Sequence, residues 1–169
     1  KKASYFVFFN DGDEKDSHKK KPLDTKGIYV TENVSVDDVT KTAIKCMERG
    51  SGGGENMEND IEAIIEGIKY SPKADAVILI ADNMEAMRDY KYIDKVKKPV
   101  IVILCGTKGR INVQYLDLAR STKGSVHTVH SDITNLQNIK NGENFFIDDK
   151  EYTFQNGKYH SVYEQFKYQ

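Results

Sequence analysis

The stretch Ala74–Ala81, ADAVILIA, decides the fold, because its last six residues form a continuous apolar run of strand length. Pro72 precedes the stretch and Asp82 follows it. A continuous apolar run between such boundaries is typical of a strand buried on both faces of a parallel sheet. Pro99–Cys105, PVIVILC, has the same character. The sequence therefore predicts two buried strands of a mostly parallel sheet.

Helical patterns separate the expected strands. Shorter strands are expected at Tyr5–Phe9, Gly27–Thr31 and Ser125–Val129, and helices after Ser35, from Ile61 to Ile68, over about Glu85–Lys97 and around Val113–Ala119. In the helix after Ser35, an inward apolar face is expected to include Val36 and Met47. Alternating strands and helices indicate an α/β fold with a doubly wound, mostly parallel, Rossmann-like sheet flanked by helices.

The residue composition and pattern of the sequence change after Asn138. Short aromatic-rich runs, such as Phe145–Ile147 and Tyr152–Phe154, are separated by turn signals that include Asn156-Gly157. This pattern predicts a small antiparallel β-meander. The expected organisation is an α/β domain over residues 1–138 followed by a β extension over residues 139–169.

Composition excludes some classes of function. The chain has 169 residues, 30% of them charged, and a formal net charge of −1. This charge balance does not favour nucleic acid as a partner, and no apolar stretch approaches membrane-spanning length. Cys46 and Cys105 are expected to be core thiols, not a disulfide pair.

The segment Gly52–Glu58, GGGENME, carries the strongest functional signal. A glycine turn leads into an Ile-rich helix, with Glu55 and Glu58 at the helix entry. These carboxylates can stabilise the helix N-terminus or can hold a hard cation. Asp82 follows a buried strand, where α/β sheets gather ligands, although it could also cap the next helix. Both interpretations remain open for these residues.

Several elements in order resemble the von Willebrand factor A (vWA) domain family. They are FFNDGD, GGGENMEN, AVILIADN, PVIVILCG and LARSTKGSVHTV, and they cover nearly all of the chain from Tyr5 to Leu136. GGGENME resembles the GGGDxPE variant, which also occurs in integrin β-subunit domains, with Met57 in place of the proline. The resemblance implies a non-enzymatic adhesion or protein-interaction module.

The resemblance also implies a metal-ion-dependent adhesion site. Its ligands would be Glu58 and Asp82, the latter through water, with Glu55 at an adjacent cation site. Asp11 and Asp13, in NDGDEKDS, faintly resemble the family's DxSxS motif. The implied cation is Mg²⁺, with Ca²⁺ or Mn²⁺ as alternatives, and it would receive an acidic side chain from a protein ligand.

The chain departs from the family pattern at its start. The family's first strand, which carries DxSxS, and the helix after it have no counterpart here, so the first strand of this chain aligns with the family's second. We expect the missing elements to lie outside this chain, for example on a second chain that supplies the strand. We also expect Mg²⁺ to bind weakly or not at all, so that a site without metal is an alternative.

The alternative function is a Mg²⁺-dependent hydrolase or phosphoryl-transfer domain that uses Asp11, Asp13 and Asp82. The serines and histidines show no local nucleophile signature. His127 and His130 are three residues apart on an expected strand, which would point them to opposite faces. A purely structural scaffold is the third hypothesis.

Overall fold

The computed structural model describes residues 5–12, 15–49, 57–107 and 109–162. The chain forms two compact units. The first unit comprises Lys1–Val77 and Glu85–Lys97, and the second comprises Ile78–Met84 and Lys98–Gln169. No helix in the described ranges combines the length and the apolar character needed to cross a membrane.

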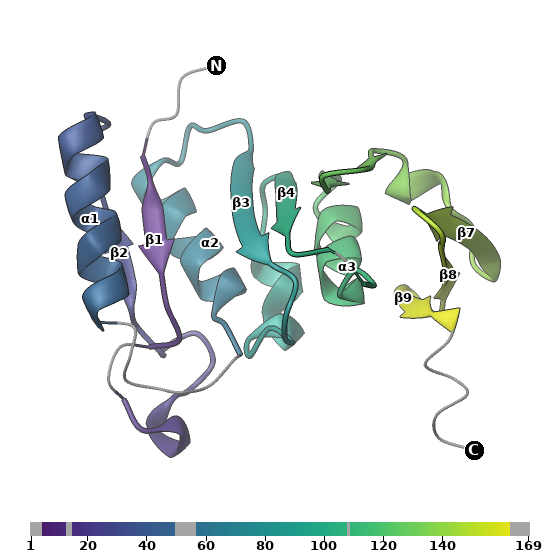
Figure 1. The fold of residues 1–169 in the computed structure, drawn as a ribbon, viewed down its shortest axis with the longest axis horizontal. Helices are drawn as coiled ribbons and strands as arrows, with labels where there is room; N and C mark the ends of the chain where they lie inside the picture. Colours follow the sequence, from purple (N-terminus) through teal and green to yellow (C-terminus); the bar gives the residue numbers. More distant parts are fainter. Residues whose placement is uncertain (1–4, 13–14, 50–56, 108, 163–169) are drawn as a thin grey trace. The chain divides into compact units, whose positions relative to one another are not determined.

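The first unit contains a small antiparallel sheet and two helices. Strands β1 (Val7–Phe9) and β2 (Ile28–Val30) pair with each other, and helices α1 (Val36–Arg49) and α2 (Asp60–Tyr70) both contact this pair (Figure 1). The short 3-10 helices are η1 (Ser17–Lys19) and η3 (Tyr90–Lys95). The helix expected over Glu85–Lys97 is therefore only a 3-10 segment in its second half.

The two helices of this unit differ in how they are buried. In α2, Ile61 is fully buried and Ile64 is 3% exposed, as expected for an apolar face. In α1, Cys46 is buried, but Val36 and Met47 are 80% and 77% exposed. The expected inward face of α1 was therefore wrong at these two residues, because the three-residue strands beneath the helix are too short to cover its whole length.

A four-stranded mixed sheet forms the centre of the second unit. Its order is β3 (Val77–Asp82), β4 (Val100–Cys105), β5 (Ser125–His127) and β6 (Asp132–Ile133). β4 and β5 are parallel, whereas β6 returns antiparallel to β5. Helix α3 (Val113–Ser121) contacts β4 and β5. The α/β class is thus confirmed, but the sheet is mixed and the doubly wound arrangement stays a prediction.

The junction after α3 brings the helix end against β4. Gly124 donates its N–H to the Ala119 carbonyl at 2.7 Å, and a Cβ at Gly124 would lie 1.8 Å from the Val100 carbonyl oxygen. Thr122 accepts the Val100 N–H on its hydroxyl at 3.2 Å. Only glycine allows the backbone to pass this close to β4.

The antiparallel strands expected after Asn138 are confirmed. After η4 (Leu136–Asn138), strands β7 (Glu143–Ile147), β8 (Lys150–Gln155) and β9 (Lys158–Ser161) form a meander. β9 contacts α3, where the Tyr159 N–H donates to Asp117 at 2.8 Å. The Arg120 guanidinium of α3 lies 3.8 Å from the ring centroid of Phe154 on β8. The meander therefore belongs to the same compact unit as the four-stranded sheet.

Candidate interaction surface

The N-terminus of α2 is capped by a residue from a distant segment. Asp89 is fully buried, and its carboxylate accepts the N–H groups of Ile61 at 3.2 Å and Glu62 at 2.6 Å. Burial raises the pKa of Asp89 to about 6, although these two hydrogen bonds act in the opposite direction. Asp89 therefore performs the helix-stabilising role that the sequence analysis left open for the glutamates before α2.

The expected ligand Glu58 lies two residues before the start of α2 and is half-buried. Its carbonyl accepts the Arg88 N–H at 2.9 Å. Asp11 follows β1 and is buried, with its carboxylate 2.9 Å from Lys20 Nζ in an ion pair whose side chains are almost completely buried. This pair gives Asp11 a structural partner. Asp13 and Glu55 lie outside the described residues.

The other expected ligand, Asp82, is exposed at the carboxyl end of β3 and accepts the Met84 N–H at 3.0 Å. Glu58 and Asp82 belong to different compact units, so their sharing of an ion stays a prediction. Among the described residues, no three His, Cys, Asp or Glu side chains are grouped in a way that could hold a metal ion. The described part of the chain therefore does not by itself fit the Mg²⁺ site that the resemblance implies.

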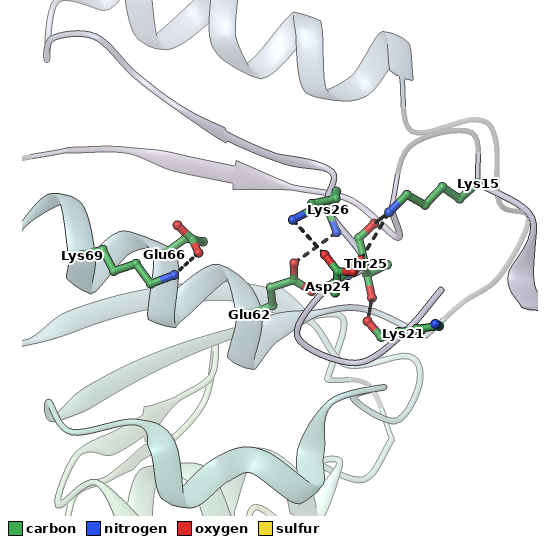
Figure 2. Close-up of polar contacts among 8 residues, drawn as sticks. All are labelled: Lys15, Lys21, Asp24, Thr25, Lys26, Glu62, Glu66 and Lys69. Carbon is green, nitrogen blue, oxygen red and sulfur yellow. Dashed lines mark hydrogen bonds and ion pairs between the residues drawn. The ribbon is translucent and has the colours of Figure 1, made fainter. Parts of the chain in front are cut away.

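Glu62 organises the loop before β2, as Figure 2 shows. Its two carboxylate oxygens accept the N–H groups of Thr25 at 2.9 Å and Lys26 at 3.1 Å. Lys15 Nζ donates to the Thr25 carbonyl at 2.7 Å. Leu23 and Lys26 have φ values of 65° and 71°, which side-chain-bearing residues rarely adopt. We interpret Glu62 as the group that holds this strained loop in place.

A surface missed by the sequence analysis lies on the β3–β6 sheet. Side chains alternate between two faces along a strand. One face is buried: Leu79, Val100, Val102, Leu104 and Val126 are each at most 4% exposed. On the opposite face, Ile78 and Ile80 are 63% and 64% exposed, and Ile103 is 38% exposed. We call this second side the open face.

Polar groups border the apolar part of the open face. Asp82 follows Ile80 by two residues on β3 and so shares its face. On the far side, His127 is paired with Ile103 of β4 and with Asp132 of β6. Cys105, at the end of β4, is exposed, so the expectation that it is a core thiol was wrong. An apolar centre with carboxylates on both sides is the arrangement of a protein–protein interface, which has a hydrophobic core and a polar rim.

One edge of the same sheet is open as well. In the strand order, β3 stands at the end and is hydrogen-bonded only to β4 within the described ranges. An edge strand exposes backbone N–H and C=O groups that can pair with another strand. β3 thus combines an open edge with an exposed apolar face. Sequence reasoning predicted the strand but assumed that both its faces were buried.

Three polar side chains form a hydrogen-bonded chain at the β5–β6 end of the open face. Ser125 Oγ lies 2.7 Å from His127 Nε2, and His127 Nδ1 lies 2.6 Å from Asp132 Oδ1. This is the order of groups in serine hydrolases, but there the acid is buried, whereas the Asp132 side chain is 78% exposed. A pocket of about 270 Å³ includes Asp132 but not Ser125 or His127 in its lining. We interpret the three residues as a link between β5 and β6.

Comparison with protein-family models, with curated proteins and with solved structures gives no match.

Proposed function

We propose that this chain is a non-enzymatic protein-interaction module of vWA type, which binds a protein partner through the open face and open edge of the β3–β6 sheet. The observation that carries the proposal is the exposure of Ile78 and Ile80 on a strand whose other face is buried. Parallel strands of this apolar composition are normally covered on both faces. A partner that covers these residues would remove their apolar surface from water.

The vWA resemblance supports the same class of function. It predicts that the first strand of the sheet comes from outside this chain, and β3 has an open edge among the described residues. A protein ligand would coordinate Mg²⁺ near Glu58 and Asp82 only if other residues, such as Glu55 and Asp13 or groups of the partner, supply further oxygen ligands. The proposed binding through the sheet does not require the cation.

The test is selection of binding protein fragments from a display library by the immobilised chain. Fragments that bind the chain should lose binding to Ile80→Asp, because a charge in the centre of the open face must be desolvated in the complex. Phe146→Asp is the matched control, since Phe146 is 67% exposed on the separate β7–β9 sheet. Fragments that bind the unaltered chain, Ile80→Asp and Phe146→Asp equally would contradict the proposal.

An assay of phosphoester turnover with Mg²⁺ addresses the alternative function. We expect no turnover from this interaction module. Turnover that Asp82→Ala abolishes would favour the metal-assisted hydrolase instead, because Asp82 belongs to both hypotheses and is exposed at the end of a strand.

A further inference from the structure

We infer that a pocket between strands β6 and β7 binds an arginine side chain of an extended peptide. The pocket has a volume of about 270 Å³ and is lined by residues of β6, of β7 and of the segments next to them. All of these residues belong to the second compact unit. The inference goes beyond the proposed function, because the isoleucines of the open face do not line this pocket.

The pocket has an apolar base. Ile133 of β6, Ile139 after η4 and Ile147 of β7 line it, and each is at most 7% exposed. Phe145 of β7 also lines the pocket, and its ring stacks on the ring of Tyr152 with 5.8 Å between the centroids. A long side chain with a charged end can lay its methylene stem along such an apolar surface.

The charged part of the lining is acidic. Asp132 of β6 and Glu143 of β7 provide one carboxylate from each strand, and none of the described lining residues is basic. Asp132 Oδ1 contacts His127 Nδ1 at 2.6 Å, and Glu143 Oε2 accepts the Lys140 N–H at 2.8 Å. A cleft with charges of one sign attracts the opposite charge. A guanidinium, with five N–H donors in a planar fork, can bind both carboxylates in addition to these contacts.

Hydrogen bonds hold the two sides of the pocket together. Ser131 Oγ donates to Asp148 Oδ1, which ties the residue before β6 to the residue after β7. The Tyr159 hydroxyl donates to the Leu136 carbonyl at 2.8 Å, so that η4 is attached to β9. The pocket is therefore formed before a ligand arrives, and this lowers the entropic cost of binding.

The size and the position of the pocket indicate that the arginine belongs to a peptide. Its volume of about 270 Å³ lies below the roughly 300–1,000 Å³ of most small-molecule sites, so it suits a single side chain. Among the described residues, β6 and β7 each stand at the end of their sheet. An extended peptide can pair with an open sheet edge while one of its side chains enters a pocket beside that edge.

The test is an NMR titration of the isotope-labelled chain with the capped peptide Thr-Val-Arg-Val-Thr, whose Val and Thr favour an extended conformation. We expect saturable binding at millimolar concentration or below, with changes in the amide signals of Ile133, Phe145 and Ile147. The peptide with Lys in place of Arg should bind about threefold more weakly, since an ammonium lacks the planar fork of donors. The peptide with citrulline, a neutral isostere of Arg, should bind at least about tenfold more weakly.

Two variants locate the charge effect. Glu143→Gln and Asp132→Asn should each weaken binding of the Arg peptide about two- to fivefold, because each removes one exposed carboxylate. Both variants keep a side-chain oxygen that can accept a hydrogen bond from the Lys140 N–H or from His127. Asp82→Asn is the matched control, since it removes the same charge from an exposed residue outside the pocket. The amide spectrum of each variant verifies that it is folded.

The outcomes separate this inference from the proposed function. The inference would be overturned by a lack of saturable binding, by equal binding of the Arg and citrulline peptides, or by tighter binding of the Lys peptide. Equal binding to Glu143→Gln, Asp132→Asn and the unaltered chain would also overturn it. Ile80→Asp should bind the Arg peptide as the unaltered chain does. Weaker binding to Ile80→Asp would place the peptide on the open face, which would overturn the inference and leave the proposed function standing.

Discussion

The two compact units are stabilised by different kinds of contact. The first unit buries many polar groups, among them the Asp11–Lys20 ion pair and the carboxylates of Glu62 and Asp89. The second unit is mainly apolar inside, with Val100, Val102, Leu116, Leu118 and Val126 fully buried. Buried polar groups stabilise a fold only while every partner is in place, whereas apolar packing depends on volume and coverage. The first unit should therefore respond to pH and charge, and the second to changes of shape.

The largest expected effect is a charge placed on the covered face of the second unit. Val102→Asp would bury a carboxylate without a partner, and we expect it to lower the free energy of unfolding by more than about 4 kcal/mol. Ile80→Asp, on the open face of the same sheet, should change it by less than about 1 kcal/mol. Urea unfolding of both variants measures the difference. Equal losses would show that the open face is covered within the chain.

A change of shape at the end of α3 should have the next largest effect. In Gly124→Ala, the new Cβ would meet the Val100 carbonyl at 1.8 Å, so the backbone must shift. We expect a loss of roughly 3 kcal/mol in the free energy of unfolding. Gly109→Ala is the control, because a Cβ there would have nothing within 4 Å. A loss of similar size in both variants would contradict the close approach of Gly124 to β4.

The pH response of the first unit depends on Asp89. Its pKa is about 6 in the folded protein, above the value of 3.8 for an unperturbed Asp. Its contribution to stability is therefore fully present below pH 4 and is lost as the pH rises through 6, by roughly 2–3 kcal/mol. Asp89→Asn cannot titrate, so its stability relative to the unaltered protein should increase between pH 4 and 7. Thermal unfolding measures the stability of both proteins. If the difference between them stays constant from pH 4 to 7, the raised pKa of Asp89 is refuted.

The loop held by Glu62 gives the smallest of the four effects. Glu62→Ala would leave the N–H groups of Thr25 and Lys26 without their carboxylate, and we expect a loss of roughly 2 kcal/mol. Hydrogen exchange should increase first at these two amides, because the left-handed Lys26 conformation depends on its surroundings. Unchanged exchange would show that other contacts hold the loop. Glu66→Ala is a matched control on the same helix, one turn further along.

The sequence predicted the parts of the fold that follow from local patterns. The strand β4 lies within PVIVILC, and all of β3 except its last residue lies within ADAVILIA, as the β-branched apolar runs of strand length predicted. Asn156-Gly157 correctly marked the turn of the β8–β9 hairpin, in which both residues have positive φ. These features need only short-range information.

Other features could not be read from local patterns. Whether Ile78 and Ile80 are covered depends on which elements pack on β3, and a buried and an exposed Ile look alike in a sequence. Asp89 caps a helix that begins 29 residues earlier, a long-range contact without a local motif. The Ser125–His127–Asp132 chain depends on the pairing of β5 with β6, which was not predicted. The placement of Glu58 relative to Asp82 stays a prediction.

The order of the two units along the chain has a consequence for synthesis on the ribosome. The described part of the first unit ends at Lys97, so this unit can close before the rest of the second unit, from Lys98 onward, has emerged. β3 interrupts the first unit but needs β4, which begins at Val100, and the second unit is complete only when Tyr159 docks on α3. During this interval Ile78 and Ile80 lack even their neighbouring strand. The growing chain is then most prone to aggregation, and a segment that binds β3 would act as its earliest protection.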